Sequence, residues 1–419
     1  MERNNDDQWL LWLCVSRVGF ATIFTTYSAA LPLLRTDWHM SASQAGIVQS
    51  AWHIGYLVSL FAVGFLGDRF GAKRTFLWAS AAASVSALVF AVFTEGFLSA
   101  LLLHGLAGLC SGGSYTPGLA LIAERFRSAG QGRAMGFYLA AASVGYAVSL
   151  LLSAVLIPSY GWRAAFIVTA CGPLIATAVS FWLLRGAPNV VHPFPEEHQS
   201  RGSSLVVLKN KPAMLSVWAY VFHAWELLGL WAWLPAYLAA GMAYGEGITP
   251  AAVGIGAILT ALTYFPSAAG SIVGGSLSDR WGRTSVILLM SVTSLVCSFL
   301  FGWLIGFPLW LLVVVATVYN FTATADSSVH STTLSELVPP RYIGAAYSLR
   351  SVLGFGAGAI SPWLFGLMLD WTHGVLQQSE TIAWGLAWSI LGLGALAGPA
   401  ATWKLRRRPE AAMLAGGLR

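Results

Sequence analysis

Long apolar stretches separated by short polar connections dominate the pattern of this chain. Twelve of them approach or exceed the roughly 20 apolar residues that a helix needs to cross a bilayer. The stretches do not alternate apolar with polar residues, and backbone amides in lipid must be bonded within the segment, so they are predicted to be helices. The expected spans are 9–33, 42–66, 74–94, 98–123, 133–157, 163–185, 213–239, 250–277, 284–304, 308–334, 343–369 and 381–403.

The longest polar stretch, 186–212, divides these spans into six and six. Its proline, serine and charged residues are typical of a linker. The sequence therefore predicts a six-helix bundle over 1–185, a cytoplasmic linker over 186–212, and a second six-helix bundle with a short basic tail over 213–419.

Connections that carry basic residues alternate along the chain with connections that carry few charges. With the termini and the even-to-odd connections on one side, that side carries 19 Lys and Arg and the other carries two. By the positive-inside rule, this split predicts a multi-pass protein of the cell (inner) membrane with both termini cytoplasmic. The remaining two, Arg17 and Arg350, fall inside predicted helices.

Composition excludes several classes of protein. Apolar residues make up 57% of the chain and charged residues 10%, whereas soluble chains carry about 25% charge. The net charge of +6 is spread between apolar stretches, so no nucleic-acid partner is expected. The four cysteines lie in apolar stretches without a CxxC pair, and no P-loop or nucleophile–base set is present. We therefore expect no enzyme activity, cofactor or metal site, and a monomer in contact with membrane lipid.

The two halves carry matching landmarks. GFLGDRFGAKR follows the second helix at 64–74, and GGSLSDRWGR follows the eighth at 274–283. Glu124 and Glu336 are 212 positions apart, as are Gly132 and Gly344. A constant offset of this kind indicates a duplicated unit, so the fold class predicted is an all-α membrane protein with twelve transmembrane helices in two pseudo-symmetric six-helix bundles.

GFLGDRFGAKR and its weaker copy resemble the loop signature of the major facilitator superfamily, and YGWRAAF at 160–166 is also similar to that family. The chain is loosely similar to the family's bacterial small-anion porters of the nitrate/nitrite and cyanate type. The resemblance implies a conformational latch in which Asp68 pairs with Arg125 or a neighbouring helix end. The alternative is that these charges only set topology. The implied latch residues are Gly64, Asp68, Arg69, Gly71, Arg125, Asp279, Arg280 and Gly282.

Ionisable residues at bilayer depth are candidates for function because each charge there costs at least about 2.5 kcal/mol. We expect Arg17, His53, Tyr56, Glu226, Asp326 and Arg350 to bind substrate, and Glu226, His104, His223, Asp326 and His330 to couple protons. Three structural alternatives stay open: Arg17 can reach toward the membrane surface, Asp326 can pair with Arg350, and His104 can serve packing.

The function predicted is a proton-coupled secondary active transporter that moves a small solute, an anion, by alternating access. Its partners would be that small molecule and protons. A proton-driven exporter of hydrophobic compounds is the first alternative, which would not need the charge of Arg17. A non-transporting membrane sensor is the second, although the linker 186–212 is short for a signalling domain.

Overall fold

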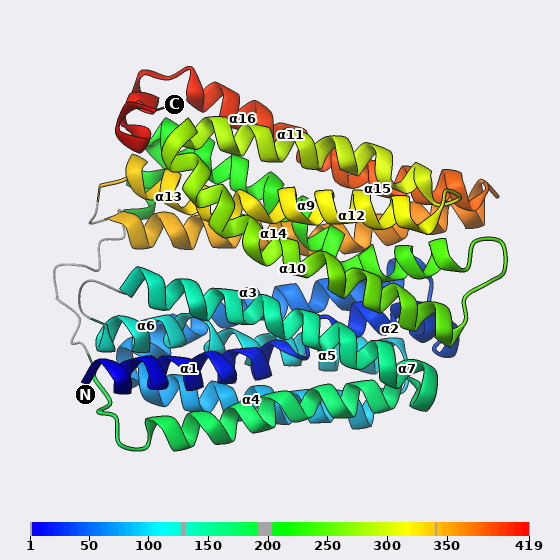
Figure 1. The fold of residues 1–419 in the computed structure, drawn as a ribbon, viewed down its shortest axis with the longest axis horizontal. Helices are drawn as coiled ribbons and strands as arrows, with labels where there is room; N and C mark the ends of the chain where they lie inside the picture. The colour runs from blue at the N-terminus through cyan, green and yellow to red at the C-terminus, as the bar shows by residue number, and fades with distance from the viewer. Residues whose placement is uncertain (1, 127–130, 192–202, 340–341, 419) are drawn as a thin grey trace. The chain divides into compact units, whose positions relative to one another are not determined.

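The described parts of the chain fold entirely into helices and their connections (Figure 1). A computed structural model describes residues 2–126, 131–191, 203–339 and 342–418, and no β-strand occurs within these ranges. Eleven helical stretches in the described ranges are long and apolar enough to cross a membrane.

One of these stretches contains two of the predicted spans. Helix α7, Gln131–Leu184, is interrupted at Gly161, where φ is 78° and ψ is 170°. A residue with a side chain rarely adopts this conformation, which glycine tolerates. The chain reverses direction there (Figure 1), so the spans predicted at 133–157 and 163–185 lie on either side of the break. With α7 counted twice, the twelve-helix prediction is confirmed.

The described residues group into two compact units. Unit 1 consists of Met1–Met40, Ala51–Glu196 and Ile248–Ala261, and unit 2 of Ser41–Ser50, Glu197–Gly247 and Leu262–Arg419. The predicted domain boundaries at 185 and 213 stay a prediction. Two short segments group differently from that division: Ser41–Ser50 belongs to unit 2 and Ile248–Ala261 to unit 1.

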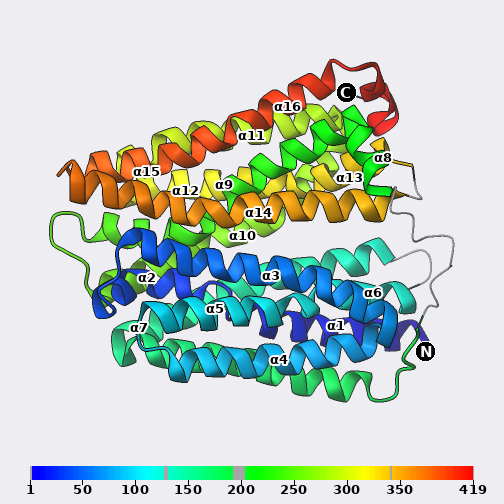
Figure 2. The same cartoon turned by 180° about the vertical axis from the view of Figure 1, so that it is seen from behind.

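Within unit 1, α1 and α4 both pack against α7 (Figure 2). The helices whose larger part lies in this unit are α1 Glu2–Ala21, α2 Thr26–Asp37, α3 Ala42–Phe70, α4 Ala72–Phe93, α5 Phe97–Ser111, α6 Thr116–Arg125 and α7. The break between α1 and α2 is rich in threonine, whose hydroxyls compete for backbone partners. Thr22 donates to the carbonyls of Gly19 and Thr169, each at 2.8 Å, which fixes the break against α7.

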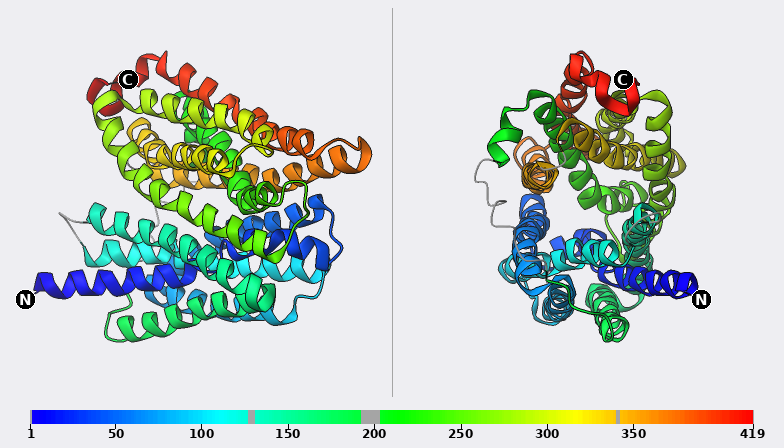
Figure 3. Two further views of the ribbon diagram at one scale, coloured as in Figure 1. Left: turned by 45° about the vertical axis from the view of Figure 1, so that its right-hand side comes forward. Right: turned by 90° about the vertical axis from the view of Figure 1, so that its left-hand side faces the viewer.

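Within unit 2, α9 is the central helix and contacts α12, α14, α15 and α16 (Figure 3). The longer helices are α9 Lys211–Met242, α10 Pro250–Trp281, α11 Arg283–Phe301, α12 Leu309–Ala325, α13 Ser327–Leu337, α14 Ile343–Asp370, α15 Glu380–Ala395 and α16 Ala397–Arg406. The short helix α8, Ser203–Lys209, precedes them, and the 3-10 segment η6, Pro409–Gly417, follows. Trp233 is fully buried against Phe365, with ring centroids 4.9 Å apart.

The turn that carries the sequence signature has the same geometry in both halves. Gly71 precedes α4 with φ 87° and ψ 151°, and Gly282 precedes α11 with φ 90° and ψ 150°. Each turn is also bonded from the C-terminal end of its half, by the chain after α7 in the first half and by the last residue of α16 in the second. Asn189 donates to the carbonyl of Phe70 at 2.8 Å, and Arg406 donates to Thr284 at 3.2 Å. The duplication read from the sequence is therefore present in local structure.

Many large apolar side chains remain exposed, as expected of helices that face lipid. They include Phe65, Val155, Ile272, Leu300 and Trp310, which are 56–71% exposed. Hydroxyl and charged side chains are found buried among the helices instead, and these form the candidate sites.

Candidate substrate and proton sites

Arg17, on α1, is a buried cation in unit 1. Its side chain is 7% exposed, and its guanidinium donates to the hydroxyl of Ser114 at 2.8 Å. The guanidinium carbon lies 5.6 Å from the ring centroid of Tyr115 and 5.5 Å from that of Tyr138. Tyr56 on α3 is in hydrogen-bond contact with it, so the structure brings together the predicted Arg17 and Tyr56.

No acid neutralises Arg17 among the described residues, and its Nε atom has no hydrogen-bond partner. Cation–π contacts and hydroxyl groups stabilise a guanidinium only partly when water is excluded. The arrangement is suited to accept an anionic group.

The predicted histidines of unit 1 are buried among aromatic rings. His104, on α5, is 2% exposed, with its ring centroid 4.8 Å from that of Tyr27 and 5.0 Å from those of Trp52 and Phe90. His53 on α3 is also 2% exposed. These surroundings favour the packing interpretation of His104, and the proton role of His104 and the substrate role of His53 stay predictions.

Glu226, near the middle of α9, is held by hydroxyl groups. It is 3% exposed, and its carboxylate accepts from Ser294 at 2.9 Å and from Ser298 at 2.6 Å, both on α11. Ser298 is in turn bonded to Tyr319 of α12. Glu226 forms no ion pair with Lys or Arg within the described residues, and the two serine hydroxyls that bond it are neutral donors.

Asp326 stands between two histidines at the junction of α12 and α13. Its carboxylate lies 3.0 Å from Nδ1 of His223 and 3.4 Å from Nε2 of His330. The other ring nitrogen of His223 is bonded to Ser327 at 3.0 Å. Both histidines and the aspartate are at most 7% exposed. The sequence predicted each acid–histidine pair separately, and the fold joins them.

Arg350 is not the partner of Asp326. No ion pair between them is found in the described part of the chain; Arg350, on α14, donates to Ser331 at 2.8 Å. Its guanidinium carbon lies 4.3 Å from the ring centroid of Tyr220 and 4.8 Å from that of Tyr347. The structural Asp326–Arg350 pair considered from the sequence is therefore replaced by a His–Asp–His cluster and a separate arginine.

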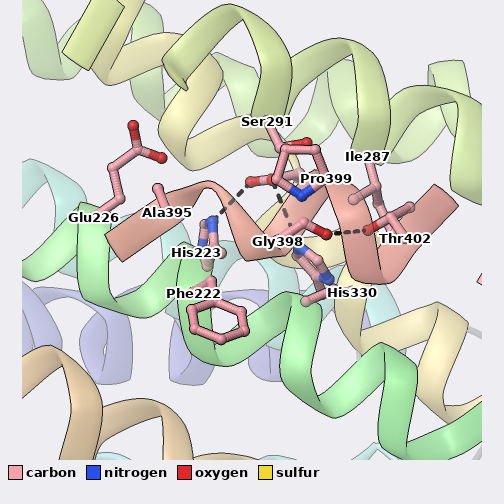
Figure 4. Close-up of a pocket in the computed structure, with 12 residues that line it drawn as sticks. Phe222, His223, Glu226, Ile287, Ser291, His330, Ala395, Gly398, Pro399 and Thr402 are labelled. Carbon is pink, nitrogen blue, oxygen red and sulfur yellow. Dashed lines mark hydrogen bonds and ion pairs between the residues drawn. The ribbon is translucent and has the colours of Figure 1, made fainter. Parts of the chain in front are cut away.

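Glu226 and the His–Asp–His cluster line one small cavity in unit 2 (Figure 4). Its polar lining is supplied by His223, Glu226, Ser291, Asp326, His330 and Thr402. Four titratable groups line the cavity, with Glu226 one turn from His223 on α9. Groups so arranged can exchange a proton through water or a small side-chain rotation.

The same cluster is the set of residues that could hold a metal ion. One ligand atom each of His223, Asp326 and His330 lies within 4.8 Å of the others. Two histidines and a carboxylate form a common zinc ligand set. Without a metal, Asp326 contacts both imidazoles, but Oδ1 of Asp326 and both ring nitrogens of His330 are buried without a hydrogen-bond partner among the described residues, so hydrogen bonds do not satisfy the cluster fully.

The latch residues are arranged differently in the two halves. Arg125 pairs with Asp6 at 2.8 Å, and no ion pair of Asp68 is found among the described residues. In the second half, Arg283 bonds Asp279 and also lies 2.9 Å from Glu336. The predicted Asp68–Arg125 contact is thus absent from this structure, and the role of the latch residues, Gly64, Arg69 and Arg280 included, stays a prediction.

Sequence reasoning missed the neutral partners of the charged groups. Ser114 and Tyr138 surround Arg17, Ser294 and Ser298 bond Glu226, and Arg283 links the second signature to α13. The spacing of Ser294 and Ser298 by four places both on one helix face, a signal that was available in the sequence.

Sequence comparison with known proteins places this chain among transporters. The sequence model of the Major Facilitator Superfamily matches residues 13–266 and 246–417. The chain is 26% identical over 400 residues to the probable sulfoacetate transporter SauU of Cupriavidus necator, covering 88% of this chain and 87% of that protein. It is 24% identical over 377 residues to the hexuronate transporter of Bacillus subtilis, with 86% and 87% covered. It is 26% identical over 363 residues to the cis,cis-muconate transport protein of Acinetobacter baylyi, with 81% and 82% covered.

Solved structures show the same fold. A mutant of the nucleoside transporter NupG superposes with a TM-score of 0.75 at 14% identity, covering 95% of this chain and 99% of the other. A bacterial homologue of the human lysosomal transporter Spinster, in an inward-facing unoccupied conformation, gives 0.75 at 15% identity, covering 96% and 97%. Identities this low carry the fold and not the substrate.

Proposed function

Since this chain belongs to the Major Facilitator Superfamily and is a multi-pass membrane transporter rather than an enzyme, we propose that it moves a small organic anion together with protons by alternating access. The observation that carries the proposal is Arg17, a buried guanidinium without an acidic partner among the described residues.

The anion would bind Arg17 through a carboxylate or sulfonate group. A guanidinium forms two parallel hydrogen bonds to such a planar or tripodal group, and Nε of Arg17 has no competing partner. Tyr56 and Tyr115 would contact the remainder of the molecule. Relatives named for sulfoacetate, hexuronate and cis,cis-muconate support an organic acid in place of the nitrate or cyanate suggested by the sequence resemblance.

Protons would enter through the acids of unit 2. A charged Glu226 depends on Ser294 and Ser298, whereas a protonated Glu226 needs less support from its surroundings. Loss or gain of its proton therefore changes which helix arrangement is favoured, which is how a binding equilibrium drives a conformational one. His223, Asp326 and His330 would pass the proton along the cavity that they line with Glu226. Arg350 is proposed separately, as a cation of unit 2 that can bind an anionic group.

The location follows from the charge distribution. We place the protein in the cytoplasmic membrane with both termini inside, because 19 of 23 Lys and Arg lie on one side of the predicted helices. That it is a monomer stays an expectation.

Uptake into proteoliposomes tests the proposal. Purified protein is reconstituted, and radiolabelled organic acids of two to seven carbons are offered with the outer medium more acidic than the lumen. We expect accumulation of at least one acid, and we expect an uncoupler that collapses the pH gradient to abolish it. Accumulation that is indifferent to the uncoupler would reject proton coupling. Transport confined to lipophilic cations, and preserved in Arg17→Ala, would establish the exporter alternative.

A further inference from the structure

A second polar cavity lies at the end of unit 2 that carries the C-terminal segment. Its volume is about 360 Å³, and it is lined by Lys209, Asn210, Lys211, Pro212, Leu337, Arg408, Glu410 and Met413. The lining comes from α8, the start of α9, the end of α13, and η6 with the residue before it. This cavity is separate from the His–Asp–His cluster, whose lining shares no residue with it.

The cavity has an excess of positive charge. Lys209, Lys211 and Arg408 face it from three segments, against the single acid Glu410. Within the described residues, none of these cations forms an ion pair or a side-chain hydrogen bond, and Oε2 of Glu410 is buried without a partner. The first turn of the 32-residue helix α9 adds the positive end of its dipole. The groups that would neutralise this charge are absent from the chain described here.

The walls of the cavity are fixed by packing. A cluster of fully or nearly fully buried side chains lies beneath it, formed by Val207, Leu334, Leu337, Leu405, Ala411 and Leu414. Asn210 caps α9 by accepting from the amide of Ala213 at 3.1 Å, and it donates to the carbonyl of Leu337 at the same distance. The amide of Ala415 is bonded to Glu336 at 3.0 Å, which holds η6 in place. The cationic side chains therefore project from a preformed rim.

Exposed apolar residues border the same region. Val206 and Leu208 of α8 are 43% and 48% exposed, and Met413 of η6 is 56% exposed. A segment with polar and apolar faces lies in the plane of the membrane interface. A ligand that combines a negative group with acyl chains fits both features.

We propose that this cavity binds the phosphodiester headgroup of an anionic phospholipid, with its acyl chains against the exposed apolar residues of α8 and η6. Lys209, Lys211 and Arg408 supply the charge, as basic pockets beside transmembrane helices do for anionic lipids. The bound lipid then joins the linker segment to the C-terminal segment. This proposal is independent of the transported substrate and of proton coupling.

Native mass spectrometry of the purified full chain tests it. The protein is offered equimolar phosphatidylglycerol and phosphatidylcholine in detergent, and bound copies are counted. We expect the anionic lipid to be retained preferentially. The variant Lys209→Gln/Lys211→Gln/Arg408→Gln should lose roughly tenfold or more in its affinity for that lipid, since each charge near a lipid headgroup contributes about fivefold.

Two further variants make the outcome decisive. Arg185→Gln/Lys404→Gln/Arg407→Gln removes the same charge outside the cavity and should leave retention unchanged. Glu410→Gln removes the only acid of the lining and should strengthen retention, a change that impaired folding cannot produce. Equal retention of both lipids, or equal losses in the two triple variants, would overturn the site. Displacement of the lipid by millimolar inorganic phosphate would overturn the lipid as its ligand.

Discussion

At the scale of single residues, Arg17 and Glu226 differ in how their charge is supported. Arg17 donates to the hydroxyl of Ser114 at 2.8 Å, contacts Tyr56 and has tyrosine rings about it, whereas both carboxylate oxygens of Glu226 accept from serines. The first arrangement leaves a cation available to a ligand. The second can hold the acid in either protonation state, since serine hydroxyls donate or accept.

Arg17→Ala is expected to raise the KM for an organic anion about 10- to 100-fold, because a hydrogen bond to a charged group contributes about 1.5–3 kcal/mol. Arg17→Lys should recover part of this through its charge. Concentration-dependent uptake in proteoliposomes measures both. Arg163→Ala, which removes an exposed arginine beside Trp162, is the control and should transport normally. Normal KM in Arg17→Ala would remove this residue from the substrate site.

Glu226→Gln is expected to retain exchange of substrate across the membrane and to lose accumulation driven by a pH gradient. Glutamine imitates the protonated acid and keeps hydrogen bonds to Ser294 and Ser298, but it cannot release a proton. Counterflow and pH-driven uptake separate the two activities. Ser291→Ala, which changes a neighbouring hydroxyl of the same cavity, serves as the matched control. If Glu226→Gln still accumulates substrate, the proton site moves to Asp326 and its histidines.

At the scale of elements, the repeated signature builds the same turn twice. Gly71 and Gly282 have positive φ with extended ψ, a region that is open to glycine and strained for other residues. A Cβ on Gly71 would also lie 2.6 Å from the side-chain amide of Asn189, which bonds both ends of this turn. The turn is therefore fixed by backbone conformation and by the segment after α7.

Gly71→Ala and Gly282→Ala should each destabilise the protein by about 1–3 kcal/mol, the usual strain of such a conformation. Thermal unfolding in detergent should show a midpoint lowered by several degrees. Gly64→Ala, where an added Cβ meets nothing within 4 Å, is the control on the same signature. A midpoint equal to wild type in both strained variants would show that these turns are not held as the structure has them.

At the scale of the whole molecule, the distribution of charge predicts which side each connection faces. A cysteine introduced by Gly186→Cys in the linker should react with an impermeant maleimide only after the cells are opened. A cysteine from Glu246→Cys, between α9 and α10, should react in intact cells. The four native cysteines, free in the structure, are replaced first. Labelling of the linker in intact cells would contradict the topology.

The sequence by itself determined the number and approximate position of the membrane-spanning stretches, because apolar length and backbone satisfaction in lipid are local properties. The breaks inside several of these stretches, such as that between α1 and α2, were not predicted. It also determined the duplicated turn, since Gly71 and Gly282 stand at matching positions of one motif. It named Arg17 and Tyr56 as members of one substrate-binding set, which stays a prediction, and it did not predict the hydrogen bond between them.

Only the tertiary structure decided which buried polar groups meet. Helical spacing places His330 on the face of Asp326, yet His223, 103 positions before that aspartate, lies closer to it than His330 does. Likewise Ser114, 97 positions after Arg17, accepts a hydrogen bond from it, and Arg125 pairs with Asp6 rather than with Asp68. A helix's sequence fixes the direction of each side chain, but its partner depends on how helices pack, which is set by shape complementarity over many neutral contacts.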